Sequence, residues 1–386
     1  MQNYLPSTNS KQSHRFPKGY PTEILSGEGC YVYDPKGNKY IDFMCSLGPI
    51  ILGHRYEKVV DYVTWVEKNY GTSFSLSHPL ERKLSDLLCE MIPSAEMVRY
   101  FHNGKDPTAA AVRLARHITG REKILSFSYH GADDTFMACT EANNGVPKCL
   151  EDTIKVFDYN ELEAIEKVLK DDIACVILEP HTIRKPDRDY LEIIRELCNI
   201  SGTLLIFDEI VSFPRYPKYS AQAYFGVTPD LTCISKGMAN GYAISALVGK
   251  EKYMKEFKDQ GVFASTTFGG NLVGVAAAIA TLGEVIAKDV PDHIWKMGEF
   301  FRETCKVKTV GLPCRQFFEF ESEKDRWKLM QYCVSKGIFY GIPIFFNYSM
   351  KEEHIAQAVA ITNEAHDKLP MLELLGDMPR EVFRKV

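Results

Sequence analysis

The sequence has no long apolar run and no excess of charge of one sign. No stretch of about 18 consecutive apolar residues occurs in the 386-residue chain, so a transmembrane helix is not expected. The segment Met1–Tyr20 is polar and has no apolar core, which argues against a secretory signal. The 46 basic and 51 acidic residues give a net charge of −5, so overall charge offers no reason to bind a nucleic acid or a membrane.

Motifs for metals and nucleotides are missing as well. The eleven cysteines form no CxxC pair, and structural zinc sites need spacing of that kind. Their scattered pattern is typical of reduced thiols in a cytoplasmic protein. Neither GxGxxG nor GxxxxGK[ST] is present, which weakens the alternative of a nucleotide- or dinucleotide-binding α/β protein. The content of 45% hydrophobic and 25% charged residues is that of a soluble globular protein.

Short β-branched runs alternate with segments of helical periodicity. This alternation predicts a parallel sheet that is covered by helices on both faces. The expected strands are Met97–Phe101, Lys123–Phe127, Ala174–Leu178, Leu204–Phe207 and Leu231–Ser235. The expected helices are Ala109–Thr119, Asn160–Lys170, Asp189–Ile200 and Leu272–Leu282.

The chain length predicts about two to three domains. Gly29–Asp42 has two alternating runs around a turn-forming Asp-Pro-Lys-Gly-Asn, so we expect a hairpin there. Pro291 interrupts a helical stretch within Lys288–Trp295, and we expect a domain boundary at that point. The predicted division is an N-terminal segment 1–60 that packs with the small domain, a large domain 61–287 and a C-terminal small domain 288–386.

Three segments carry residues suited to chemistry. Asn103-Gly104-Lys105-Asp106-Pro107 follows an expected strand and opens a helix, with Asp106 expected at the N-cap and Pro107 as the first helical residue. A helix N-terminus binds phosphate, although a plain strand-loop-helix connection has the same pattern. Asp208-Glu209 ends another expected strand, where ligands bind in open α/β sheets; the alternative is a surface acidic pair. Lys236 follows a third expected strand, and is either a solvated lysine or a Schiff-base nucleophile.

The order of these segments resembles the class III family of pyridoxal-phosphate aminotransferases, of fold type I. Within that family the sequence is most similar to the glutamate-1-semialdehyde 2,1-aminomutase branch. The stretches that carry the likeness are Asp34–Asp42, Ser46–His54 (SLGPIILGH), Gly71–Glu81, Ile92–Arg116, Gly120–Asp134 and Asp208–Arg215. The resemblance implies a large domain with a mainly parallel seven-stranded sheet between helices, and a smaller α+β domain built from the N- and C-terminal segments.

The resemblance also assigns the site, with pyridoxal 5′-phosphate as cofactor. Lys236 would form the Schiff base, and Asp208 would face the pyridine nitrogen and keep it protonated, which strengthens the cofactor as an electron sink. Tyr129 and Ile210 would lie on the two ring faces. The other cofactor-binding residues that it implies are Asn103, Gly104, Lys105, His130, Glu179 and Thr267. Thr267, in the polar turn Ser265–Asn271, would reach the phosphate of a neighbouring subunit, so a homodimer is implied.

Three departures from the family pattern affect the expected activity. Lys105 stands where the family has a small hydroxyl residue, and would contribute a point charge or point away. His181–Lys185 is a short basic stretch, either solvated or able to recognise an anionic substrate. Arg215, in contrast, stands where the family also has an arginine, and would pair with a substrate carboxylate or form a structural ion pair. The segment after Asp134, which gates the site in the aminomutase branch, is abbreviated, and this fits an ordinary two-substrate aminotransferase.

We therefore expect a cytoplasmic enzyme that transfers an amino group from an amino-acid donor to a carbonyl acceptor, both small molecules. An aminomutase of the glutamate-1-semialdehyde type, or a pyridoxal-phosphate-dependent decarboxylase or lyase, uses the same cofactor and stays an alternative. A non-catalytic relative that keeps only the fold is a further alternative. No metal is expected.

Overall fold

The computed structural model describes residues 16–127, 129–169, 172–183, 186–187, 189–259 and 261–379. Its largest sheet has seven strands in the order β4-β10-β9-β8-β7-β5-β6. These strands are β4 (Met97–Phe101), β5 (Lys123–Phe127), β6 (Ile154–Val156), β7 (Ile173–Leu178), β8 (Leu204–Asp208), β9 (Leu231–Ile234) and β10 (Ser245–Gly249). Only β10 runs antiparallel to its neighbours within this sheet, so the expected mainly parallel, seven-stranded sheet is confirmed.

Helices cover both faces of this sheet, as the continuous apolar strands require. Alternate residues of β8 enter different cores: Leu204 and Ile206 pack with α3, whereas Leu205 and Phe207 pack with α6. Since successive side chains of a strand point to opposite faces, α3 and α6 lie on opposite sides of the sheet. The helices of this part are α1 (Glu57–Tyr70), α2 (Pro79–Met91), α3 (Lys105–Thr119), α4 (Asp134–Met137), α5 (Leu162–Val168), α6 (Tyr190–Ser201), α7 (Ala221–Phe225), α8 (Glu251–Met254), α9 (Glu256–Asp259) and α10 (Leu272–Ala287).

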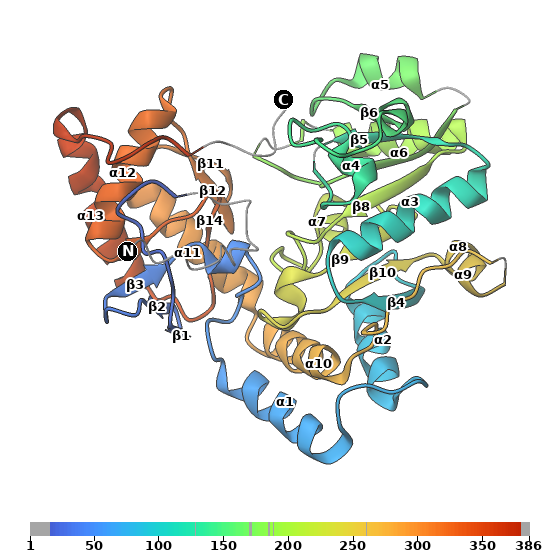
Figure 1. Cartoon of the computed structure of the whole chain (residues 1–386), viewed down its shortest axis with the longest axis horizontal. Coiled ribbons are helices and arrows are strands. Elements are labelled where there is room, and N and C mark those ends of the chain that lie inside the picture. The colour runs from blue at the N-terminus through green and yellow to red at the C-terminus, as the bar shows by residue number, and fades with distance from the viewer. Residues whose placement is uncertain are drawn as a thin grey trace.

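The N-terminal strands and the C-terminal elements lie together on the other side of the molecule (Figure 1). A four-stranded sheet has the order β1-β2-β3-β13, and a three-stranded sheet the order β11-β12-β14. The strands are β1 (Ser26–Glu28), β2 (Tyr31–Tyr33), β3 (Lys39–Asp42), β11 (Thr309–Leu312), β12 (Arg315–Phe318), β13 (Ile338–Phe339) and β14 (Ile344–Phe345). The helices α11 (Val290–Thr304), α12 (Glu323–Ser335) and α13 (Glu352–Lys368) accompany them. The hairpin expected in Gly29–Asp42 is present as β2 and β3.

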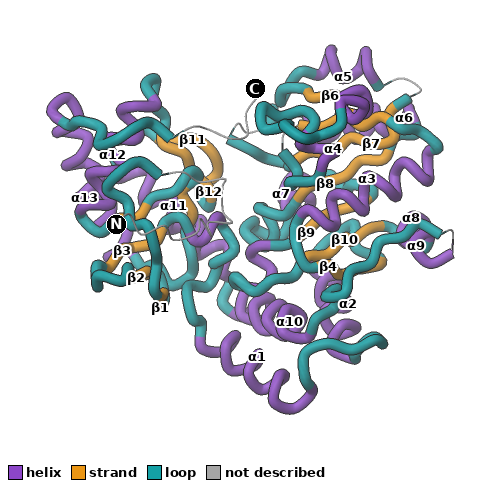
Figure 2. Tube along the Cα trace, in the orientation of Figure 1, coloured by secondary structure: helices purple, strands orange, loops and turns teal. Residues whose placement is uncertain are grey.

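Loops make up much of the region between the two groups of sheets (Figure 2). The short 3-10 helices of the described residues are η1 (Cys45–Leu47), η2 (Lys148–Thr153), η3 (Lys236–Ala239) and η4 (Leu369–Met371). Within the described residues, no helix is long and apolar enough to span a bilayer. The expected boundary near Lys288–Trp295 falls between α10 and α11, and the division into domains stays a prediction.

Two local expectations were wrong. The N-cap of α3 is Gly104 and not Asp106, and the helix starts one residue earlier than Asp106. Asp106 Oδ2 instead accepts the backbone N–H of Asn103 at 3.0 Å, so it stabilises the loop before the helix. Pro107 then lies in the first turn, where its missing N–H is tolerated. At the other site, Pro291 does not break the helix: it lies in the first turn of α11, and the chain turns at Asp289, which has φ 50°.

Candidate active site

The predicted site residues lie along one edge of the seven-stranded sheet. Strands β4, β5, β7, β8 and β9 run in one direction, so their carboxyl ends meet at that edge. Ligands bind at this edge in open α/β sheets. The residues that follow these strand ends are Asn103, Tyr129, Glu179, Asp208 and Lys236.

Asp208 is the last residue of β8 and is only 5% exposed. Its Oδ2 lies 2.7 Å from Nδ1 of His130, and its Oδ1 accepts the backbone N–H of Ile210 at 3.1 Å. His130 is itself buried, and its Nε2 has no hydrogen-bond partner among the described residues. The two contacts fix the orientation of the carboxylate, and an acceptor oriented in this way suits a protonated ring nitrogen.

The neighbouring carboxylate of Glu209 has a different role. Glu209 is fully buried and accepts hydrogen bonds from the backbone N–H groups of Ala221 and Gln222, at 2.6 and 3.2 Å, which open α7. Burial raises its pKa above the ordinary value. Glu209 thus satisfies the free backbone N–H groups at the start of a short helix. The alternative of a surface acidic pair at Asp208-Glu209 is wrong, because both carboxylates are buried.

Lys236 begins η3, directly after β9, and is half-buried with φ 40°. Burial, and after it the positive charge of Arg315, lowers the pKa of its amine from 10.5 to about 8. No hydrogen bond from this amine is present among the described residues. An amine with this pKa is roughly 10% neutral at pH 7, against roughly 0.03% for a lysine in water. Lys236 is therefore far better prepared than a solvated lysine to act as a nucleophile or base.

Arg315 is a site residue that the sequence analysis missed. It opens β12 in the C-terminal part, and its Nη1 lies 2.7 Å from Oε2 of Glu179 at the end of β7. Both side chains are partly exposed, at 17% and 15%, so the pair is accessible from solvent. The positions are 136 residues apart, and nothing local in the sequence marks Arg315 beyond its place before an apolar run.

The loop at the start of α3 meets two other predicted segments. A Cβ at Gly104 would lie 3.2 Å from Cδ1 of Ile210, and a Cβ at Gly131 would lie 2.8 Å from Cβ of Lys105. Thr108 donates its hydroxyl to the carbonyl of His130 at 2.8 Å. The phosphate-loop candidates, the segment around His130 and the residues after Asp208 are thus in close contact; this approach needs glycine at position 131, which has φ 109°, and a larger residue would be crowded at position 104.

The remaining candidates are placed as follows. Tyr129 is half-buried, and burial raises the pKa of its phenol. Thr267 is exposed on the turn before α10. Arg184 and Lys185 of the basic stretch lie outside the described residues. Arg215 is fully buried and pairs with no carboxylate of the described residues; it donates to the backbone carbonyls of Gly48 and Val211, and burial lowers its pKa to about 10.

These residues fit pyridoxal phosphate. A fixed, buried carboxylate is available for the pyridine nitrogen, and a partly desolvated amine lies at the next strand end. The 15-residue helix α3 offers its N-terminus for the phosphate, behind a glycine whose missing Cβ leaves room beside Ile210. Comparison with known families gives the same answer: residues 17–309 match the model of "Aminotransferase class-III". The chain belongs to the class-III aminotransferase family. It is accordingly a pyridoxal-phosphate-dependent enzyme, and the expected cofactor and fold type are confirmed.

The relatives of this class-III aminotransferase include enzymes with two different activities. The 3-aminobutyryl-CoA aminotransferase of Cloacimonas acidaminovorans is 44% identical over 309 residues, covering 77% of this chain and 73% of the relative. The glutamate-1-semialdehyde 2,1-aminomutase of Methanococcus maripaludis strain C5 is 36% identical over 321 residues, covering 76% and 74%. Among solved structures, the FumI protein of Sphingopyxis sp. MTA144 in its internal aldimine form superposes with a TM-score of 0.88 at 24% identity, covering 96% of both chains.

Proposed function

We propose that this enzyme transfers an amino group between an amino-acid donor and a carbonyl acceptor, with Lys236 as the residue that moves the proton. The observation that carries the proposal is the half-buried amine of Lys236, which lies just after β9 and next to the strand that ends in Asp208; burial, and after it the charge of Arg315, lowers the pKa of this amine to about 8. Bound pyridoxal phosphate supplies an electron sink for the bond that breaks at the substrate carbon. The neutral amine of Lys236 can accept the proton released there and deliver it elsewhere, which is the task of a general base with a pKa near the working pH.

The other residues of the site would position and polarise the cofactor and the substrate. With the cofactor bound, Asp208 would keep the pyridine nitrogen protonated, and His130 holds the carboxylate of Asp208 in its orientation. Gly104 and Lys105 at the start of α3 would hold the phosphate, and Tyr129 and Ile210 would hold the ring. Arg315 offers the substrate a guanidinium near the reacting amine, and Glu179 occupies that guanidinium in this structure.

Aminomutation of the glutamate-1-semialdehyde type is a second candidate, favoured by 36% identity to such an enzyme. Amino transfer ranks first because the identity to an aminotransferase is 44%. The two candidates differ in what leaves the site: transamination releases a keto product from the donor, whereas aminomutation returns an isomer of its substrate.

We further propose that the active unit is a cytoplasmic homodimer. Thr267 lies on an exposed turn, and large apolar side chains are exposed on two loops: Phe74 and Leu76 before α2, and Phe263 and Phe268 before α10, are 54–84% exposed. Apolar groups of this size on a surface mark a contact with another chain. The eleven cysteines, all free within the described part of the chain, fit a reducing compartment. Sedimentation velocity tests the dimer; a monomer at all concentrations would contradict it.

The test of the function is a half-reaction. Stoichiometric pyridoxal-phosphate-loaded enzyme is mixed with one donor at a time, beginning with glutamate, alanine, 3-aminobutyrate and its CoA thioester. We expect at least one donor to bleach the visible absorbance and to release one equivalent of its keto product. The matched control is Lys236→Ala, which should do neither. Release of an isomer from glutamate 1-semialdehyde, with no keto product from any donor, would establish the second candidate instead.

A further inference from the structure

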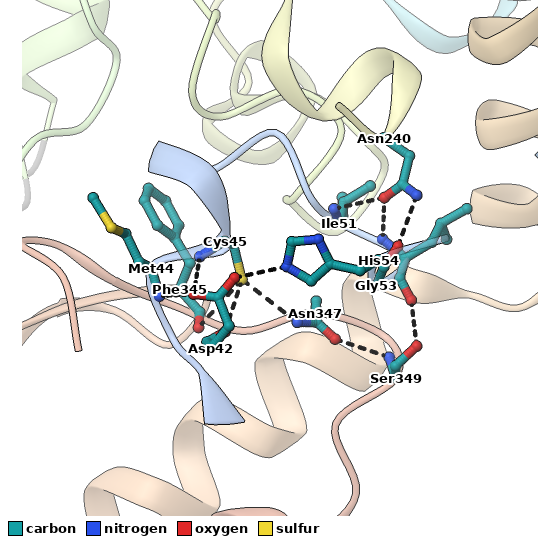
Figure 3. Close-up of polar contacts among 11 residues, drawn as sticks. Asp42, Met44, Cys45, Ile51, Gly53, His54, Asn240, Phe345, Asn347 and Ser349 are labelled. Carbon is teal, nitrogen blue, oxygen red and sulfur yellow. Dashed lines mark hydrogen bonds and ion pairs between the residues drawn. The ribbon is translucent and has the colours of Figure 1, made fainter. Parts of the chain in front are cut away.

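A segment of the N-terminal region links the lysine loop to the C-terminal sheet. We call residues 42–54 the strap. It begins at the last residue of β3, passes through η1 and ends at His54, and Figure 3 shows its polar contacts with Asn240 on one side and with Asn347 and Ser349 on the other. None of these contacts is part of the site described above.

The strap contains a backbone turn that ordinary residues rarely adopt. Cys45, Ser46 and Leu47 have φ values of 48°, 54° and 70°, and Gly48 follows with 101°. Each non-glycine residue in this region costs about 1–3 kcal/mol, so the surroundings must hold the turn in place. Asp42 does so at the start of the turn: its Oδ1 accepts the backbone N–H groups of Met44 at 2.9 Å and of Cys45 at 3.0 Å.

The side chain of Asp42 is itself held by His54. Its Nε2 lies 2.8 Å from Oδ2 of Asp42, and Asp42 is 2% exposed. The imidazole lies directly against the backbone of Gly27, where a Cβ would be 2.6 Å from its Cγ. The backbone of His54 also exchanges two hydrogen bonds with Gly29, of 2.7 and 2.9 Å. The Asp42–His54 pair thus connects the two ends of the strap and closes it into a loop.

One side of this loop is fastened beside Lys236. Asn240, four positions after Lys236, accepts the N–H groups of Ile51 and Leu52 at 3.0 and 2.9 Å and donates to the carbonyl of Gly53 at 2.9 Å. Arg215 donates to the carbonyl of Gly48, and its Nη1 would be 2.8 Å from a Cβ on Gly237. The strained turn therefore rests, through Arg215, on the backbone next to Lys236.

The other side is fastened to the strand beside Arg315. Phe345 donates its N–H to the carbonyl of Phe43 at 2.7 Å, and its ring would be 3.0 Å from a Cβ on Gly48. Ser349 donates to the carbonyl of Leu52 at 2.7 Å. In the three-stranded sheet, Phe345 of β14 is the cross-strand partner of Arg315 in β12. The strap thus links the strand beside Arg315 to the loop that carries Lys236.

We propose that Asp42 and His54 are positioning residues, which act through the strap to hold Arg315 and its partner Glu179 beside the amine of Lys236. This inference rests on the proposed function, since only a reactive Lys236 gives the placement a chemical consequence. The charged groups that face the amine are Arg315, Glu179, Asp208 and Arg215. Arg315 is the one among them that lies on the C-terminal sheet, so we expect loosening of the strap to displace it.

The test measures Lys236 directly, in apoprotein, by the pH dependence of its acylation by a trace of acetic anhydride, read by peptide mass spectrometry. Wild type should show a midpoint near 8. Arg315→Gln should raise the midpoint by roughly one pH unit, because a nearby like charge is removed. His54→Gln should raise it by roughly 0.5 unit, which slows acylation at pH 7 about threefold. In the Arg315→Gln background, His54→Gln should add nothing.

The matched control is Arg55→Gln, because Arg55 follows His54 directly in the chain. Arg55 pairs with Glu28 at 3.1 Å, and both side chains are about two-thirds exposed. The acylation midpoint of Lys236 in Arg55→Gln should equal that of wild type. Ser349→Ala removes the hydrogen bond to the strap from the C-terminal part, and it replaces His54→Gln in the test if that variant does not fold. It should shift the midpoint in the same direction. A His54→Gln or Ser349→Ala protein that melts earlier but keeps the wild-type midpoint overturns the inference. Because no catalysis is measured, failure of the proposed amino transfer would leave this result unaffected.

Discussion

Replacing the reactive lysine with an apolar side chain of similar length should stabilise the apoprotein. Lys236 holds its amine half-buried and without a hydrogen-bond partner among the described residues, which lowers the pKa from 10.5 to about 8. A difference of roughly 2.5 between the two pKa values corresponds to about 3 kcal/mol, the cost of keeping the ammonium in the fold. Lys236→Met removes that cost, so at pH 7 we expect the free energy of unfolding to rise by about 3 kcal/mol.

The pH dependence of the gain checks its cause. The folded-state pKa lies below the unfolded one, so between pH 8 and 10.5 the unfolded chain binds more protons and wild-type stability rises with pH. The advantage of Lys236→Met should therefore be complete at pH 7, fall to about 1 kcal/mol near pH 9.5 and vanish above the unfolded value. Urea unfolding of both apoproteins at the two pH values measures this difference.

The control for this experiment is Lys296→Met, which replaces an exposed lysine that pairs with Glu352 at 2.8 Å. Surface pairs of this kind contribute little, so we expect a change within about 0.5 kcal/mol at either pH. A Lys236→Met protein that is less stable than wild type at pH 7, or one whose advantage does not shrink with rising pH, would refute the argument that the amine is held at an energetic cost.

The other predictions concern the carboxylate and two glycine contacts. Asp208→Asn should lower kcat/KM by on the order of 10²-fold, because a neutral amide no longer holds the positive charge on the ring nitrogen; an unchanged value in steady-state assays would exclude Asp208 from that role. Gly104→Val should weaken cofactor binding about tenfold in a pyridoxal phosphate titration with little change in Tm, since the added methyl groups crowd the start of α3. Gly298→Ala should destabilise the protein by at least about 2 kcal/mol, because the new Cβ would meet the carbonyl of Pro313. Gly283→Ala, another mid-helix glycine with open space around it, should be neutral or slightly stabilising in the same denaturant assay.

The sequence predicted the part of the site that depends on strand ends. Asp208 and Lys236 each follow a strand predicted from the sequence, and the rule that parallel strands finish at one edge is enough to bring them together. The helix start was predicted less well, because Gly104 takes a helical conformation against Ile210 before Asp106 can act as a cap. That contact is tertiary, and helix propensity carries no information about it.

The contributions from the C-terminal part were not predictable in this way. Arg315 meets Glu179 only because a separate three-stranded sheet lies against the edge of the large one. The strap depends on hydrogen bonds from Asn347 and Ser349, about 300 positions further along the chain. No periodicity or local motif encodes pairs at such separations. Arg215 shows the converse: its charge suggested either a substrate contact or a structural ion pair, whereas in the structure it donates to backbone carbonyls in the interior.

The most direct test of the account is to locate the residue that holds the cofactor. Purified enzyme is loaded with pyridoxal phosphate, reduced with sodium borohydride and digested, and the pyridoxyl-modified peptide is sequenced by mass spectrometry. The account predicts a single modified residue, Lys236, and no modification in Lys236→Ala treated in the same way. Modification of Lys105 or of another lysine in its place, or an unmodified Lys236 in loaded enzyme, would contradict the central claim that this amine, at the end of β9, carries the chemistry.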